Sequence, residues 1–246
     1  MMFTAGIAGA CVQRAAAARW AEMAAWAQRS EAAWRARDFT RAPLSGEATA
    51  GSAFAAYREA VALAVPLGRG DAASRLLMDL RLRPERVTPA DAEAFAGRWA
   101  PPLAAMREGA HRSDARPQID CAKGFSHPMQ NLLDGRNLMN AATIVARRLQ
   151  ADGHDLEAVT MLLDAATFGV DVARSPLLIE QMIGAALVAI VAGEAWRDED
   201  LRALDRKALR LLGDGLARLD ELCPRVVPLD AEPLLLANTL LHEDLR

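Results

Sequence analysis

The 246-residue chain has few of the features from which a biochemical function is usually recognised. Aromatic residues make up 5% of it, so Leu, Ala and Val must do most of the packing. Its three cysteines, Cys11, Cys121 and Cys223, lie far apart without a CxxC or Cys/His ligand spacing. This pattern argues against structural zinc and, because the count is odd, against a framework of disulfides. No metal and no other cofactor is predicted.

The chain also has no large excess of charge of one sign. Its net charge of −3 argues against a dedicated nucleic-acid surface. Basic pairs occur at Arg147-Arg148 and Arg206-Lys207, but acidic residues follow within a turn or two, which is typical of solvated helix faces. We therefore expect no nucleic-acid partner.

Catalytic signatures are missing as well. The sequence contains no HExxH, P-loop, dinucleotide glycine fingerprint or Ser/His/Asp signature. The run Gly213-Asp214-Gly215 falls inside a helical stripe, so it indicates a kink or a tight helix contact rather than a phosphate site. No catalytic residue is assigned on this basis.

The first twelve residues are apolar apart from Thr4, but they are too few to span a bilayer, which needs about 20 residues. These residues contain no basic segment, which a signal peptide would require. The run Ala8 to Cys11 is similar to a lipoprotein cleavage site. A cytoplasmic location is favoured, with an envelope protein tethered at Cys11 or by an upstream anchor as the alternative.

Hydrophobic residues make up 52% of the chain, much of it alanine, and this composition favours an all-α fold. An N-terminal helical region is predicted over 1–115. Its long helix, 5–37, places Trp20, Met23 and Trp34 on one face, through which self-association is an open possibility. Shorter helices are predicted over 52–64, 71–82, 89–99 and 102–110, the last two separated by Pro101-Pro102.

A stack of helical hairpins is predicted over 116–246. Its helices are expected over 129–151, 155–174, 176–193, 199–222 and 231–242. Because Met182 to Gly193 contains no polar side chain, the third is predicted to be the buried central helix of the stack. Gly184 and Ala185 would let a neighbouring helix approach it closely.

The hairpin from about Met139 to Val172 resembles a tetratricopeptide (TPR) helix pair. Gly153 lies at its turn, and small and large apolar residues alternate on both helices: Val145, Ala146, Leu149, Ala158, Leu162 and Ala165. Ala142 replaces the usual aromatic residue and Val170 the terminal proline. The resemblance covers about 34 residues and implies a stack of antiparallel helical hairpins, similar to an α-solenoid.

The segments 41–47 (RAPLSGE) and 175–184 (SPLLIEQMIG) resemble those of a family of bacterial all-helical proteins. Members of that family often have an N-terminal membrane anchor. The resemblance supports the fold and implies no particular chemistry.

Glu180 and Gln181 are the best candidates for a binding site, because they interrupt an otherwise apolar helix. A buried carboxylate needs a partner, which Arg136, Asn140 or Arg147 of the preceding hairpin could supply. Such a contact would either fix the register of two helices or form the polar floor of a ligand groove.

The predicted function is a non-enzymatic scaffold that binds a protein or peptide on the 129–222 stack. One alternative is a helical enzyme or small-ligand binder with a polar pocket near Asp120, His127, Arg136 and Glu180. In the enzyme, Cys121 would be the thiolate nucleophile and His127 its base. The other is the membrane-tethered envelope protein. The sequence leaves the oligomeric state open.

Overall fold

The computed structural model describes residues 21–22, 24–29, 31–33, 35–119, 134–175, 177–195 and 198–222. The chain divides into two compact units, a larger one of residues 39–118 and 129–227 and a smaller one of 1–38, 119–128 and 228–246. In the smaller unit, the described residues between 21 and 36 are helical, as predicted for that part of 5–37, and Trp26 is exposed. Cys11, Asp120, Cys121, His127 and the predicted helix 231–242 lie outside the described residues.

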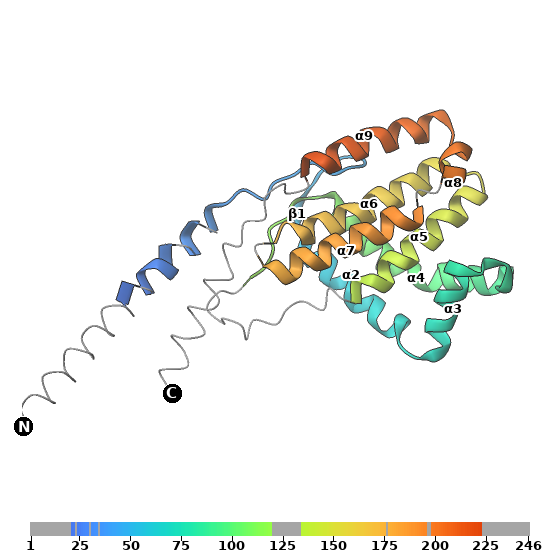
Figure 1. Ribbon diagram of the computed structural model, residues 1–246, viewed down its shortest axis with the longest axis horizontal. Coiled ribbons are helices and arrows are strands. Elements are labelled where there is room, and N and C mark those ends of the chain that lie inside the picture. Colours follow the sequence, from blue (N-terminus) through green and yellow to red (C-terminus); the bar gives the residue numbers. More distant parts are fainter. Residues whose placement is uncertain are drawn as a thin grey trace, which may run out of the picture. The chain divides into compact units, whose positions relative to one another are not determined.

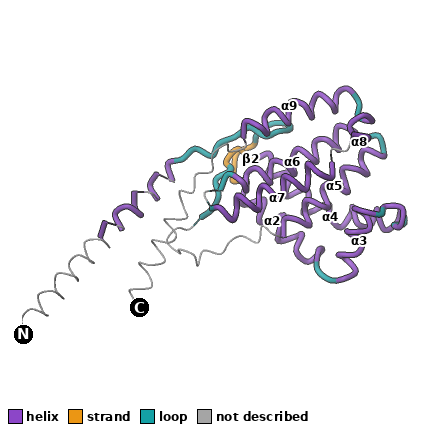
Figure 2. The backbone as a smooth tube through the Cα atoms, in the orientation of Figure 1, coloured by secondary structure: helices purple, strands orange, loops and turns teal. Residues whose placement is uncertain are grey.

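Helices make up most of the larger unit, and the all-α class is confirmed at that level (Figure 2). The elements follow the order β1 (Thr49–Ser52), α2 (Ala53–Gly68), α3 (Asp71–Leu82), the 3-10 turn η1 (Pro84–Arg86), α4 (Pro89–His111), β2 (Arg112–Asp114), α5 (Gly135–Ala151), α6 (Asp155–Ala173), α7 (Leu178–Ala195), α8 (Asp198–Ala203) and α9 (Arg206–Leu222).

The end of α3 and the start of α4 show the local chemistry expected of a proline stop and a helix cap. Helix α3 covers the predicted range 71–82, and Arg83 leaves it in a non-helical conformation before Pro84. At the start of α4, the Thr88 hydroxyl accepts a hydrogen bond from the backbone N–H of Asp91 at 3.1 Å.

The predicted break at Pro101-Pro102 was wrong, since α4 continues through both prolines. Proline removes one helical hydrogen bond and crowds the preceding turn. Here Pro102 and its neighbours Trp99 and Leu103 are buried, in a helix that packs on α2 and α6. Tertiary packing therefore outweighs the local preference.

The segment 38–51, between the predicted helices 5–37 and 52–64, is part of the fold. Strand β1 pairs in parallel with β2, from Thr49 opposite Arg112 to Ser52 opposite Asp114. Upstream of β1, the backbone N–H of Arg41 donates to Ser113 O at 3.0 Å. These contacts hold residues 39–52 along the chain that leaves α4.

Helix α6 is the centre of the larger unit, and the prediction that the 176–193 helix is central was wrong. All residues from Met161 to Val172 are buried, and α6 packs against α4, α5, α7 and α9 (Figure 1). Helix α7 contacts α5 and α6 with one side and exposes the other. The apolar composition of α7 does not distinguish a central helix from one with an exposed apolar face.

Close helix contacts occur at glycines, as predicted for Gly184. A Cβ atom there would lie 2.2 Å from the backbone nitrogen of Ala173 on α6, so α7 approaches α6 at backbone distance. Gly215 of α9 similarly faces Leu163, where a Cβ would come within 2.5 Å of the side chain. The single helix predicted over 199–222 is divided into α8 and α9 near Leu204.

Candidate functional site

Two buried polar clusters lie along α6, and the first is centred on Asp171. The Nε–H of Arg41 donates to both oxygens of this carboxylate, at 2.8 and 3.0 Å, and the Tyr57 hydroxyl donates to Oδ2 at 2.7 Å. Neither the Arg41 nor the Asp171 side chain has any exposed surface. An Arg–carboxylate pair with shared hydrogen bonds compensates the charge that burial would otherwise leave unsolvated.

Arg41 also caps the C-terminal end of α4. Its Nη1 donates to Ala110 O at 2.7 Å and its Nη2 to Gly109 O at 3.2 Å, two carbonyls in the last turn of the helix. Burial opposes the charged guanidinium, but hydrogen bonds and attraction to Asp171 outweigh it and raise the pKa of Arg41. Burial and the charge of Asp171 raise the pKa of Tyr57 well above its usual value. Arg41 therefore stays cationic, and Tyr57 stays a neutral donor.

The second cluster is centred on Asp164. The Ser45 hydroxyl donates to Oδ1 at 2.6 Å, and Arg107 Nε donates to Oδ2 at 3.0 Å. His111 Nε2 lies 3.2 Å from the same Oδ1. Ser45 and Asp164 are buried, whereas 24% of the His111 side chain and 43% of the Arg107 side chain are exposed.

Ser45, His111 and Asp164 are the residue types of a catalytic triad, but their arrangement differs from one. In a triad, one histidine nitrogen contacts the carboxylate and the other accepts the serine proton. Here Nε2 of His111 faces both Asp164 and Ser45, Nδ1 faces Glu47 O at 3.3 Å, and Ser45 donates directly to Asp164. Two acceptors around the ring favour imidazolium, and the hydrogen bond to Asp164 raises the pKa of His111. Ser45 therefore donates to the carboxylate and not to the histidine.

Both clusters have the same structural effect. Asp164 and Asp171 are seven residues apart, two turns on one side of α6, and they bind Ser45 and Arg41 of the same extended segment. The segment 41–45 is thereby fastened to α6 at two points. Both carboxylates are buried, and each cluster holds this segment against α6.

The structure supplies a local partner for Glu180 in place of one from α5. The Ser175 hydroxyl donates to the Glu180 carboxylate, and Gln181 Nε2 donates to Ser175 O at 2.7 Å. Burial raises the pKa of Glu180, and the hydrogen bond from Ser175 opposes that shift. Both contacts lie at the start of α7, and neither of them reaches α5.

The remaining candidates lie on α5, in different environments. Arg136 is exposed on α5, and Asn140 is buried on the same helix. Arg147 contacts Arg81 O at 3.5 Å and lines a separate cavity between α4 and α5. Two residues of the predicted enzyme pocket, Asp120 and His127, fall outside the described residues.

The most distinctive surface in the described part of the chain lies on α7. Six exposed apolar residues recur there at helical spacing and form one stripe, which we name the α7 apolar face. They are Ile179, Met182, Ala185, Ala186, Ala189 and Ala192. No charged side chain interrupts the stripe, and 60% of Met182 is exposed. Sequence reasoning identified these residues as apolar but assigned them to the core.

Comparisons with protein families, with curated proteins and with solved structures find no match to this chain. Within the described ranges, no group of three or more His, Cys, Asp or Glu side chains is placed to hold a metal ion. None of the helices described is both long and apolar enough to cross a bilayer.

Proposed function

We propose that this protein is a non-enzymatic interaction module whose interface is the α7 apolar face. The proposal rests on that face, a continuous apolar stripe on a helix whose opposite side packs on α5 and α6. Contiguous exposed apolar surface favours a protein contact, because burying it removes apolar area from water. The TPR-like helix pair α5–α6 acts in this view as the support that presents α7.

The partner that fits this face best is a second copy of the chain. The large side chains of the stripe, Ile179 and Met182, lie at its N-terminal end, and every later position of the stripe is alanine. A two-fold axis between Ala185 and Ala186 would set two α7 helices antiparallel. Each large residue would then face an alanine of the other copy, as a self-complementary interface requires. Alanine at the crossing allows close approach of the helices.

Charge substitutions test both the interface and its direction. Met182→Glu places a carboxylate in the contact, and we expect a concentration-dependent dimer to become monomeric in sedimentation velocity. In an antiparallel pair residue 182 faces residue 189 of the other copy. Adding Ala189→Lys to Met182→Glu should therefore restore part of the association. Within one helix these positions are two turns apart, too far for direct pairing.

Leu209→Glu on α9 is the matched control, because Leu209 is 43% exposed and lies outside the α7 apolar face. It should leave the dimer unchanged. A wild-type protein that stays monomeric at high concentration would overturn the second copy as partner. If that monomer floated with lipid vesicles and Met182→Glu did not, the face would be a membrane contact instead.

A further inference from the structure

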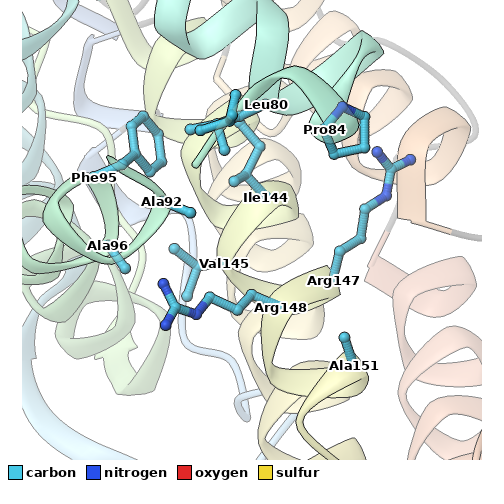
Figure 3. A pocket seen from close by; sticks show the side chains of 11 residues that line it. Leu80, Pro84, Ala92, Phe95, Ala96, Ile144, Val145, Arg147, Arg148 and Ala151 are labelled. Atoms are coloured by element: carbon cyan, nitrogen blue, oxygen red, sulfur yellow. The ribbon is translucent and has the colours of Figure 1, made fainter. Parts of the chain in front are cut away.

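A cavity of about 260 Å³ lies among α3, η1, α4 and α5. Its floor is formed by the buried side chains Leu80 and Phe95, with Ile144 and Val145 beside them. Exposed Pro84 and Ala151 lie at its margin. The walls are apolar apart from Arg147 and Arg148, which extend from α5 toward opposite sides (Figure 3). The cavity thus combines an apolar interior with two cationic groups.

Arg148 has donor capacity that the described protein atoms leave unused. Its Nε lies 3.8 Å from the Asp152 carboxylate one turn further along α5. Its Nη1 is buried and has no hydrogen-bond partner among the described residues. Although 40% of the Arg148 side chain is exposed, a buried donor atom without an acceptor is unfavourable. An anionic acceptor in the cavity would correct this.

We propose that this cavity binds a small amphipathic carboxylate, with its apolar part on Leu80, Phe95 and Ile144 and its carboxylate on Arg148. The planar guanidinium matches two carboxylate oxygens and forms charge-assisted hydrogen bonds with them. Apolar lining with a few fixed polar groups is the usual composition of a small-molecule site. The cavity does not involve α7, so this proposal is independent of the dimer.

The volume limits the size of the ligand. An apolar cavity of about 150 Å³ accommodates benzene, so on the same scale 260 Å³ accommodates about ten carbon atoms. This corresponds to a medium-chain acid of eight to ten carbons or an aryl-substituted acid of similar size, in the range of about ten carbon atoms. A longer chain would have to extend into solvent.

The test uses decanoate as the probe, with 1-decanol as a neutral ligand of the same length. Isothermal titration of the full chain should show saturable binding of decanoate and weaker binding of the alcohol. Arg148→Gln keeps a polar side chain but removes the charge, and it should weaken decanoate binding about tenfold or more. Arg210→Gln on the exposed side of α9 is the matched control and should have no effect.

Ala96→Leu provides a second variant that leaves Arg148 in place. Ala96 lines the cavity and is half-buried, so a leucine there fills space that the ligand needs without disturbing the core. It should weaken the binding of both probes. Equal affinity for decanoate and decanol would overturn the role of Arg148. Saturable binding that neither variant alters, or no binding of either probe, would overturn the site.

Discussion

Helices α6 and α7 lie side by side and are both rich in apolar residues, yet their environments are opposite (Figure 1). Helix α6 carries two buried aspartates, Asp164 and Asp171, and is the most enclosed helix described. Helix α7 has no polar side chain from Met182 to Gly193 and exposes one whole side. The more polar of the two helices is therefore the central one.

The two helices differ in the side chains that contact them. Arg41 and Tyr57 donate hydrogen bonds to Asp171, and Ser45 donates one to Asp164. Neither buried carboxylate is therefore left without a partner. The exposed stripe of α7 is apolar and receives no such contacts. The hydropathy of a helix describes only its composition. Its burial depends on which other helices and polar side chains of the chain pack against it.

The largest effect is expected from removing the main partner of α6. Arg41→Met leaves the Asp171 carboxylate buried beside a neutral side chain, which costs about 3–5 kcal/mol. Urea denaturation should show this as a lower free energy of unfolding. Arg58→Met, on the exposed side of α2, is the control and should change it by less than about 0.5 kcal/mol. Adding Asp171→Leu to Arg41→Met should recover part of the loss, because it removes the unpaired charge but not the unpaired carbonyls of Gly109 and Ala110. No recovery at all would contradict the pairing argument.

A smaller effect is expected where α7 meets α6. Gly184→Ala introduces a Cβ 2.2 Å from the backbone of Ala173, and overpacking of this kind costs about 1–3 kcal/mol. Gly193→Ala on the same helix meets nothing within 4 Å, so it should stabilise the protein by about 0.5–1 kcal/mol. Opposite signs in thermal denaturation would distinguish the packed and exposed sides of α7. Equal responses would contradict that distinction.

The smallest effect is expected at His111, which contacts Asp164 of α6 and is partly exposed. The hydrogen bond to Asp164 raises the folded-state pKa of His111 above the usual value of 6.5. Its stabilising contribution is therefore fully present below about pH 6.5 and is lost as the pH rises through the folded-state pKa. His111→Gln should destabilise the protein more at pH 6 than at pH 9. His154→Gln, at an exposed position before α6, serves as the control.

The sequence predicts most of the helices in the larger unit because their ends carry local signals. Thr88 caps α4, Arg83-Pro84 ends α3, and Gly153 makes the turn between α5 and α6 with a φ of +81°. Where tertiary packing overrides such signals, prediction fails, as at Pro101-Pro102. The four-residue strand β1 is too short and polar to be recognised without β2.

The polar clusters were beyond the reach of sequence reasoning for a different reason. Arg41 and Ser45 lie in the segment 41–47, which stood out only through its resemblance to a bacterial family. Their partners on α6 are 130 and 119 residues further along the chain. No local spacing links residues so far apart. Glu180 and Gln181 contact Ser175, which is local, whereas the expected partner was remote.

The separation of Arg41 from Asp171 also has a consequence for biosynthesis. Translation adds about 5–20 residues per second, so the 130-residue interval means that Arg41 is made about 7–26 s before its carboxylate partner. During that time the guanidinium has no buried carboxylate to pair with. The extended segment 39–47 can form its hydrogen bonds to α6 only after α6 has left the ribosome. The N-terminal helices therefore complete their packing late, when a helix encoded far downstream arrives.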